Sequence, residues 1–507
     1  MLAILQFDAA SVSLVGRMLA AGRLPVLAGL VERGRWLELD GPATHFAAGA
    51  FPTLYTGAEI AEHGLFYPFQ WSAPEQRVRY TTAFDAPAPI WERVSGVRCL
   101  VIDPYESRPP RRPPAGTLVS GWQLSDRVVL QRWSSPTGTH RRLTRLFGPP
   151  GAVEEVFGRH SADELLGLRR RLLAASDRVT QAATLLLGRE AFDLVWLTFG
   201  AAHVAGHQFW DLSQVARGGV DADVRHVLST ALEEVYATVD AGLGEVLAAL
   251  PGDADVMVVS PVGMDVNTSR ADLLPEMLAA VLAGGVGDHG ATTRSSDRAG
   301  AVWRLRAAVP ADLRAKVAAA LPDTLALALT ARLETPSHDW STTRAFAHPA
   351  DNQGYVRLNL RGRERDGIVD PAGAAGVMDE IAAGLASFHD LDGEPAVAGV
   401  DRVASTVGPG RYGDRLPDLV VRFSDRPSTG LQGVRSDRFG LVRRHGAASG
   451  RSGNHTPGDA WALVVPGTSA HREPSRPARL VDVAATVAAL GEDPVDGLAG
   501  EPLLTRG

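Results

Sequence analysis

The apolar and polar positions of the chain form two kinds of segment, short β-prone runs and longer stretches with helical periodicity. The short runs are at 3–7, 194–199 and 255–260, and each is typical of a buried strand. The helical stretches are one that ends near 31, one at 162–189 and one at 225–250. Strands that alternate with helices predict an α/β fold, in which a largely parallel sheet is flanked by helices on both faces.

The pattern changes in the C-terminal half of the chain. Residues around 285–298 are rich in glycine, aspartate and serine, which is typical of a boundary. Further on, residues 354–360 alternate in the manner of an antiparallel strand. We therefore expect a core formed by 1–290 and 441–507, with a smaller α+β region inserted at 291–440.

The composition limits the classes of function. The chain has 507 residues, a net charge of -7 and one cysteine, Cys99. Acidic and basic residues are mixed, which argues against binding to nucleic acid polymers or to anionic membranes. One cysteine excludes a disulfide framework and a thiolate metal site, so a metal must be held by imidazole and oxygen. No apolar segment reaches membrane-spanning length and no leader precedes the first run, so we expect a cytoplasmic protein.

Polar residues stand where three of the predicted strands end. Asp8 follows the first strand, His203 lies just beyond the second, and Ser260 ends the third. The carboxyl ends of parallel strands form the edge at which open α/β sheets place their sites. His203 and His207 are four residues apart, so on a helical turn both imidazoles point to the same side and can bind one ion. Gly206 between them leaves room for a close backbone approach.

Several motifs follow one another along the chain in a characteristic order. They are Asp8 and the stretches 51–57, 62–64, 203–207, 259–264 and 453–455. Further blocks lie at 340–369, 416–421 and 481–491. Together they resemble the alkaline phosphatase superfamily, in the branch of type I phosphodiesterases and nucleotide pyrophosphatases and their bacterial phosphohydrolase/phosphomutase group. The resemblance covers nearly the whole chain and implies an alkaline phosphatase-like core with an inserted cap region.

The resemblance also implies roles for individual residues. Thr53 matches the nucleophile, although Thr56 is close enough to compete, and we expect Thr53 to start a helix whose N–H groups favour a phosphoryl oxygen. Asp8 matches the carboxylate that binds the metal beside the nucleophile. His207 and His455 match histidines that bind the other metal. His203 stands where the family usually has aspartate, so the three histidines imply a site suited to zinc.

The largest departure from the family pattern is at Pro261 and Val262. The family usually has Asp-His there, and both residues bind the metal beside the nucleophile. Neither side chain of this chain can do so, which leaves three outcomes open. Asp265 or Asn267 replaces the missing ligands, or one metal is bound tightly and a second is recruited weakly, or hydrolysis is lost.

Other side chains have simpler interpretations. His63 precedes a glycine in a predicted turn and is assigned a structural role. A basic group in the second region is either a solvated face or a clamp for an anion, and its members are Arg344, Arg357, Arg361 and Arg363.

The resemblance implies a metal-dependent hydrolase of phosphate esters, in particular of phosphodiester or nucleotide pyrophosphate bonds in a small phosphorylated substrate. In this reaction Thr53 attacks phosphorus, and water then releases the product from the phospho-threonine. The alternatives are a phosphomutase, a hydrolase of another ester such as sulfate, or a degenerate member that binds an anionic ligand without turnover. The sequence leaves the oligomeric state open.

Overall fold

A computed structural model describes residues 1–106, 108–125, 128, 130–152, 160–215, 220–284, 323–335, 338–350, 352–444, 451–473 and 475–506. The chain divides into two compact units. The first unit comprises Met1–His63, Ala86–Asn267 and Gly450–Gly507, and the second comprises Gly64–Asp85 and Thr268–Ser449. The expected boundary at 290/291 lies outside the described residues. The second unit also includes residues 64–85. It continues past the other expected boundary, between residues 440 and 441, because that position lies within the strand Gly440–Arg443.

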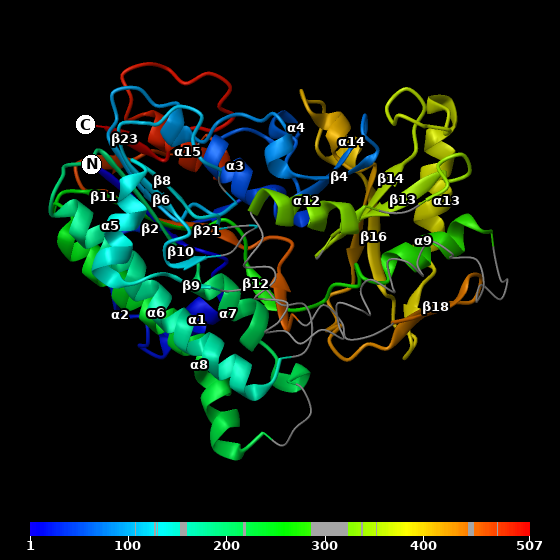
Figure 1. The fold of residues 1–507 in the computed structure, drawn as a ribbon, viewed down its shortest axis with the longest axis horizontal. Coiled ribbons are helices and arrows are strands. Elements are labelled where there is room, and N and C mark those ends of the chain that lie inside the picture. The colour runs from blue at the N-terminus through cyan, green and yellow to red at the C-terminus, as the bar shows by residue number, and fades with distance from the viewer. Residues whose placement is uncertain are drawn as a thin grey trace. The chain divides into compact units, whose positions relative to one another are not determined.

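The first unit is built on an eight-stranded sheet with the order β2-β21-β11-β1-β10-β5-β6-β8 (Figure 1). Its strands are β1 (Leu2–Phe7), β2 (Arg35–Leu39), β5 (Cys99–Ile102), β6 (Gly116–Ser120), β8 (Trp133–Ser135), β10 (Leu194–Phe199), β11 (Asp255–Ser260) and β21 (Ala460–Val465). The pairings from β11 through β6 are parallel, and those that involve β2, β21 and β8 are antiparallel. The predicted α/β fold with a largely parallel sheet is confirmed.

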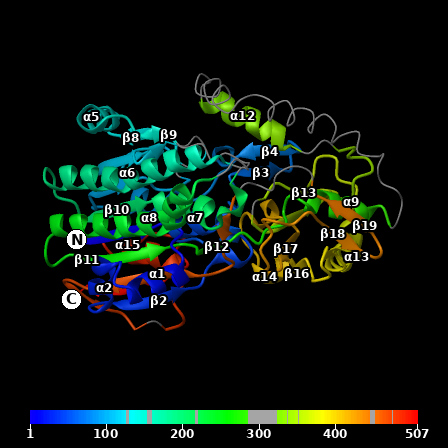
Figure 2. The same ribbon diagram turned by 90° about the horizontal axis from the view of Figure 1, so that it is seen from below.

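Helices cover both faces of this sheet, as the side-chain alternation of β1 shows. Phe7 contacts Tyr236 of α8 (Ala222–Ala249), with ring centroids 5.0 Å apart. The neighbouring Gln6 points to the opposite face, because successive side chains of a strand alternate. There its Oε1 accepts a hydrogen bond from the hydroxyl of Tyr55 in α3 (Ala50–Thr56) at 3.1 Å. On the α8 side, α6 (Ala162–Leu187) packs along α8, as Figures 1 and 2 show.

The helices near the N-terminus correct one prediction. A single helix ending near 31 was expected, but two helices form, α1 (Val12–Ala20) and α2 (Pro25–Val31). The chain leaves α1 through Gly22, whose φ of +68° is in the left-handed region, and α2 restarts with Pro25 at its first position. Among the described helices none is by itself long and apolar enough to cross a membrane, and only the bent pair α1 and α2 taken together has the length and composition.

The other elements of the first unit are shorter. Its helices are α4 (Ile60–His63), α5 (Gly138–Phe147), α7 (Ala201–Phe209) and α15 (Val481–Ala488), with 3-10 turns at Pro42–Thr44, Ile90–Glu92 and Leu212–Gln214. Its small strands are β7 (Leu124–Ser125), β9 (Gly151–Ala152), β12 (Met264–Val266), β20 (Gly453–His455), β22 (Ser469–His471) and β23 (Leu504–Arg506). Among these, α7, β12 and β20 position the candidate site.

The second unit contains a four-stranded antiparallel sheet with the order β13-β14-β17-β16. Its strands are β13 (Ala345–His348), β14 (Gly354–Leu358), β16 (Val397–Arg402) and β17 (Leu419–Phe423), beside β3 (Phe69–Ser72), β4 (Arg77–Tyr80), β15 (His389–Asp390), β18 (Gly433–Ser436) and β19 (Gly440–Arg443). Its helices are α9 (Leu274–Leu282), α12 (Asp323–Glu334), α13 (Ala374–Ala386) and α14 (Val403–Thr406). The antiparallel strand expected at 354–360 is confirmed, and it ends at Leu358.

Candidate metal centre

Three histidines meet at the edge of the first unit's sheet. Helix α7 begins directly after β10, and it presents His203 and His207 on one face, one turn apart. Strand β20 supplies His455. One ligand nitrogen of each ring lies within 4.8 Å of the other two, and all three rings are buried. These three residues form what we call the histidine cluster, and the structure thus brings together the histidines that the sequence singled out.

The hydrogen bonds of the first two rings fix where their lone pairs point. His203 Nδ1 lies 2.7 Å from Asp8 Oδ2, and His207 Nδ1 lies 2.9 Å from the carbonyl oxygen of Gly453. A carboxylate and a carbonyl only accept, so both Nδ1 atoms carry a proton, and in the neutral form of each ring Nε2 carries a lone pair. These Nε2 atoms face each other at 3.1 Å. Two lone pairs at this distance repel unless a proton or a metal ion lies between them.

The third ring completes the set. His455 is hydrogen-bonded to the backbone of Gly263, and its Nδ1 is buried with no hydrogen-bond partner. Burial lowers the pKa of His207 and of His455 well below the usual 6.5, and the nearby charge of Arg451 lowers both further. The two rings are therefore neutral near pH 7, which is the form that binds a metal. Three buried imidazole nitrogens, one of them an orphan, fit a divalent metal with an open position.

The spacing of the nitrogens also fits zinc. Two ligands about 2.0–2.1 Å from a tetrahedral zinc ion lie roughly 3.3 Å apart. The observed 3.1 Å between Nε2 of His203 and Nε2 of His207 is close to that value. The side chain of His203 is held in place by stacking on Tyr105, with ring centroids 4.8 Å apart. The donor set of this structure is therefore suited to the metal that the sequence predicted.

Asp8 is fully buried behind His203 rather than within the histidine cluster. Its Oδ2 binds His203 Nδ1, and its Oδ1 accepts a hydrogen bond from Gln6 Nε2 at 2.8 Å. Both carboxylate oxygens thus have a partner in the protein. A carboxylate in this position orients a metal-binding imidazole and raises its basicity.

Two glycines allow the strands of the site to approach α7 closely. A Cβ on Gly206 would lie 2.6 Å from Cγ of Met264, and one on Gly453 would lie 2.2 Å from the carbonyl oxygen of Gly206. Beside them, the amide of Ser452 donates to the carbonyl oxygen of His207 at 2.7 Å. The expected close backbone approach at Gly206 is confirmed. Without it, β20 would stand too far from α7 for His455 to join the other two rings.

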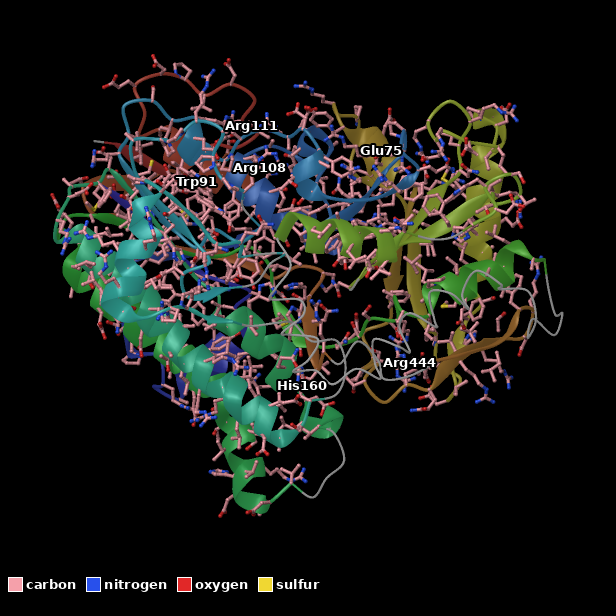
Figure 3. The ribbon with its side chains drawn as sticks, in the orientation of Figure 1. Glu75, Trp91, Arg108, Arg111, His160 and Arg444 are labelled. Atoms are coloured by element: carbon pink, nitrogen blue, oxygen red, sulfur yellow. The ribbon has the colours of Figure 1, made fainter. Side chains whose placement is uncertain are left out.

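Thr53 lies inside α3 and does not start it, which corrects the sequence expectation. The helix begins at Ala50, and the backbone N–H of Thr53 already donates to the carbonyl oxygen of Gly49 at 3.2 Å. That amide is therefore not available to a phosphoryl oxygen. The helix is anchored by Tyr55, whose ring contacts Trp91, labelled in Figure 3, at a centroid distance of 5.1 Å.

The hydroxyls of the two candidate threonines have different partners. Thr53 Oγ1 lies 2.9 Å from Nε2 of His63, and we call these two residues the threonine pair. The hydroxyl of Thr56 instead donates to the carbonyl oxygen of Pro52 at 2.6 Å, within its own helix. Both hydroxyls are largely buried. Only the Thr53 hydroxyl is therefore engaged with a side chain that can take up a proton.

His63 is a residue whose place in the site the sequence reasoning missed. It ends the short helix α4 and is fully buried. Burial lowers its pKa from 6.5 to about 3, so the ring is neutral near pH 7. Its position ten residues after Thr53 gives no periodic signal, because a turn separates the two helices. The motif Glu62-His63-Gly64 was the one available clue.

The end of β11 carries apolar residues where the family usually has metal ligands. Pro261 and Val262 are both buried. The hydroxyl of Ser260 donates to the carbonyl oxygen of Val262 at 3.0 Å and accepts from the amide of Ala10 at 2.9 Å. Over the described ranges of the chain, the histidine cluster is the single set of three or more His, Cys, Asp or Glu residues whose ligand atoms lie close enough together to hold one metal ion.

The suggested replacement ligands lie on β12 and just after it. Asp265 pairs with Asn454 in the β12–β20 ladder, and its Oδ1 accepts from the amide of Val266 at 2.6 Å. Asn267 is buried, and its Nδ2 donates to the carbonyl oxygen of Arg451 at 2.9 Å. Asp265 is not a member of the histidine cluster. Their role as metal ligands stays a prediction.

The four arginines of the basic group noted in the sequence are each paired with a carboxylate. The pairs are Arg344–Glu380, Arg357–Glu364, Arg361–Asp370 and Arg363–Asp418, with nitrogen–oxygen distances of 2.8, 2.8, 3.6 and 2.7 Å. Arg357 is 1% exposed, and its guanidinium also donates to the carbonyl oxygens of residues 414–416. Its interactions are those of a buried structural ion pair.

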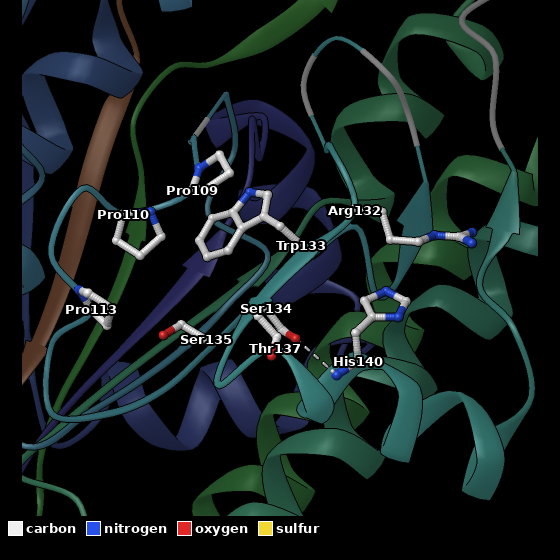
Figure 4. A pocket seen from close by; sticks show the side chains of 9 residues that line it. All are labelled: Pro109, Pro110, Pro113, Arg132, Trp133, Ser134, Ser135, Thr137 and His140. Carbon is white, nitrogen blue, oxygen red and sulfur yellow. Dashed lines mark hydrogen bonds between the residues drawn. The ribbon is translucent and has the colours of Figure 1, made fainter. Parts of the chain in front are cut away.

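A cavity of about 490 Å³ lies elsewhere in the first unit (Figure 4). Its lining residues are Pro109, Pro110, Pro113, Arg132, Trp133, Ser134, Ser135, Thr137 and His140. None of them is a residue that the sequence predicted for catalysis or metal binding. The cavity is therefore separate from the candidate metal centre in the residues that form it.

Residues 2–447 match the family of type I phosphodiesterases and nucleotide pyrophosphatases. The chain belongs to this family. His455 lies just beyond the matched range, so its membership of the histidine cluster comes from the structure. As a member of this family within the alkaline phosphatase superfamily, the protein is of the class of metal-dependent phosphohydrolases that act on small phosphorylated substrates.

Two solved structures with TM-scores above 0.5 show the same fold at low sequence identity. Phosphonoacetate hydrolase from Sinorhizobium meliloti 1021 is 14% identical with a TM-score of 0.51, and the alignment covers 96% of this chain and 95% of that one. A mutant of the alkaline phosphatase PafA is 12% identical with a TM-score of 0.51, over 99% and 98% of the two chains. Murine ectonucleotide pyrophosphatase/phosphodiesterase 5 is 11% identical with a TM-score of 0.46, over 99% and 100%. No curated protein has a significantly similar sequence.

Proposed function

We propose that this family member hydrolyses phosphodiester or nucleotide pyrophosphate bonds through Thr53, with one tightly bound divalent metal, zinc, at His203, His207 and His455. The observation that carries the proposal is the arrangement of the histidine cluster. The Nε2 atoms of His203 and His207 face each other at 3.1 Å, and Nδ1 of His455 is buried without a hydrogen-bond partner. Burying such a set costs free energy unless a cation satisfies it.

The residues of the site divide the work between binding and reaction. The three imidazoles would hold the metal, and Asp8 would keep His203 in the required tautomer and orientation. Once bound, the metal would act as a Lewis acid that polarises the phosphoryl group and neutralises developing negative charge. Thr53 would attack phosphorus, and a phospho-threonine would form as the leaving oxygen departs. Hydrolysis of this intermediate would restore the hydroxyl.

The apolar end of β11 favours a second candidate function. Pro261 and Val262 cannot bind a metal, so the protein can be a member that binds an anionic ligand without turnover. Phosphomutase and sulfatase activity remain further alternatives within the superfamily.

Metal content and turnover of chromogenic substrates test the proposal together. We expect about one zinc per chain after dialysis, and turnover of a phosphodiester in preference to a monoester or a sulfate ester. Faster turnover of the monoester or the sulfate ester would contradict the substrate class. One metal per chain with no turnover of any of these esters would favour the binding protein, and two tight metals would contradict the single-metal site.

A further inference from the structure

The nucleophile of the proposed reaction is bonded to a potential base. Thr53 Oγ1 and His63 Nε2 are 2.9 Å apart, within the range for proton transfer between a nucleophile and a general base. Both side chains are buried, at 2% and 0% exposure, so bulk water has little access to the hydrogen bond. Burial lowers the pKa of His63 to about 3, so the ring is neutral near pH 7, and the negative charge of a phosphoryl group bound beside it would raise this pKa and favour uptake of the proton. With the ring proton on Nδ1, Nε2 accepts the hydrogen bond of the hydroxyl.

The backbone holds the two partners in a fixed relation. Helix α3 ends at Gly57, whose φ of +66° is in the left-handed region, and a Cβ there would lie 2.7 Å from Leu498 and 2.8 Å from Ala484. Only glycine allows the chain to turn this tightly before α4. The amide of His63 then donates to the carbonyl oxygen of Glu59 at 3.1 Å, which fixes the end of α4.

The nucleophile is therefore placed where the usual activation is missing. A threonine hydroxyl is a weak nucleophile unless a metal or a base removes its proton. The end of β11, with Pro261 and Val262, offers no side-chain ligand for a metal on that side. A neutral imidazole at hydrogen-bond distance can remove the proton without one.

We propose that His63 is a catalytic residue of this protein, the general base that activates Thr53 in place of a second metal. The inference rests on the proposed function and deepens it. In the first step the bond between Thr53 Oγ1 and phosphorus forms, the bond from phosphorus to the leaving oxygen breaks, and the hydroxyl proton moves to His63 Nε2. The leaving oxygen takes one proton from solvent.

The second step reverses the proton transfer. Water attacks the phospho-threonine and gives up one proton to solvent, and the bond between phosphorus and Oγ1 breaks. Oγ1 takes its proton back from His63 Nε2, so the pair returns to its starting state. Over both steps one water is consumed and no net proton stays on the protein.

The variant His63→Gln tests this role in the full-length, zinc-loaded protein. Glutamine can accept a hydrogen bond from Thr53 but cannot take up its proton, so it separates a base from a positioning residue. We expect kcat to fall by about 10²–10⁴-fold, with KM and zinc per chain unchanged. Rapid quenching and peptide mass spectrometry should show phosphorylation of Thr53 slowed by the same factor. His226→Gln is the matched control, because His226 is exposed on α8, and it should behave like the wild type.

Each outcome decides the question. A folded His63→Gln protein with kcat within about threefold of the wild type overturns the general-base role. A parallel loss of bound zinc and of kcat also overturns it, since the histidine would then act by supporting the fold of the site. If His63→Gln does not fold, His63→Asn, with a shorter amide, is measured in its place by the same criteria. A wild type that turns over no phosphate ester defeats the proposed function itself, before any variant is compared.

Discussion

The histidine cluster and the threonine pair are both buried in the first unit, but their imidazole nitrogens face different kinds of partner. In the histidine cluster, partners outside the ring set hold the protons, so that nitrogen lone pairs converge on one point. In the threonine pair, the imidazole nitrogen is directed at a hydroxyl 2.9 Å away. The first arrangement favours a bound cation, whereas the second is a complete hydrogen bond.

In the proposed mechanism, a site that lacks two of the metal ligands usual in its family still has a hydroxyl beside a base. Pro261 and Val262 stand at the positions of those ligands; both are buried, and Val262 belongs to the apolar core. On the other side, an aspartate position has become His203 and retains a donor atom. At that position a nitrogen donor thus stands where the family usually has an oxygen donor.

The largest effect expected is from removal of the nucleophile. Thr53→Ala should lower turnover of a chromogenic phosphodiester by roughly 10³-fold or more, because a methyl group cannot attack phosphorus. Zinc per chain and the fold should stay as in the wild type. Thr56→Ala is the matched control, because the hydroxyl of Thr56 donates to the carbonyl oxygen of Pro52 within the same helix. Activity retained by Thr53→Ala and lost by Thr56→Ala would reverse the assignment of the nucleophile.

Removal of a predicted metal ligand should affect zinc binding, whereas a change in the threonine pair should not. His207→Ala should lose about one equivalent of zinc per chain, because two remaining imidazoles do not hold the ion tightly. The measurement is elemental analysis of the dialysed protein by mass spectrometry. His63→Gln should keep its zinc in the same assay. Zinc retained in full by His207→Ala would mean that the metal, if bound, is held elsewhere.

A smaller effect on zinc binding is expected from a change to Asp8, which is hydrogen-bonded to His203. Asp8→Asn should weaken zinc binding by about 10–100-fold, because the neutral amide supports His203 less well than a carboxylate. The affinity is measured by competition with a chelator. Asp103→Asn is the matched control, as Asp103 is also fully buried at a strand end but accepts from the amides of Trp122 and Gln123. Complete loss of zinc in Asp8→Asn would make Asp8 a direct ligand instead.

The smallest effect concerns acid stability. The pKa of His63 is about 3 in the folded protein and 6.5 for an unperturbed histidine. As the pH falls, the unfolded chain is therefore the first to protonate this ring. The stability that the neutral ring contributes is present above pH 6.5 and is lost between pH 6.5 and 3, at up to about 1.4 kcal/mol per pH unit. The free energy of unfolding of His63→Gln should therefore fall less steeply from pH 6.5 to 5 in denaturant titrations. Equal slopes for both proteins would contradict the burial of a neutral ring.

The sequence predicted the frame of the site because that frame depends on local patterns. Short β-prone runs located β1, β10 and β11 to within one residue, and the spacing of His203 and His207 placed both rings on one side of α7. The strand ends also pointed to Asp8. These patterns extend over only a few neighbouring residues, so they are visible in the sequence itself.

The contacts that decide the chemistry depend on tertiary structure instead. Asp8 reaches His203 because β1 and β10 pair in a register that sets Phe7 beside Phe199. Thr53 meets His63 because a turn at Gly57 folds α4 back onto α3, and no periodicity of the sequence encodes that turn. The prediction of a single helix near the N-terminus was wrong for a similar reason, since Gly22 and Pro25 break a stretch that is rich in alanine, leucine and valine.

The place of β21 in the sheet has a consequence for how the protein is made. This strand, at residues 460–465, lies between β2 and β11, and it is the strand to which β2 is paired in the sheet. Residues 35–39 must therefore wait until residues 460–465 have left the ribosome before they can pair with this strand. Until then β11 exposes an open edge, and His455 is not yet available to complete the zinc ligands. We expect the first unit to finish folding only after residues 460–465 have been synthesised, with the proposed metal acquired as a late event.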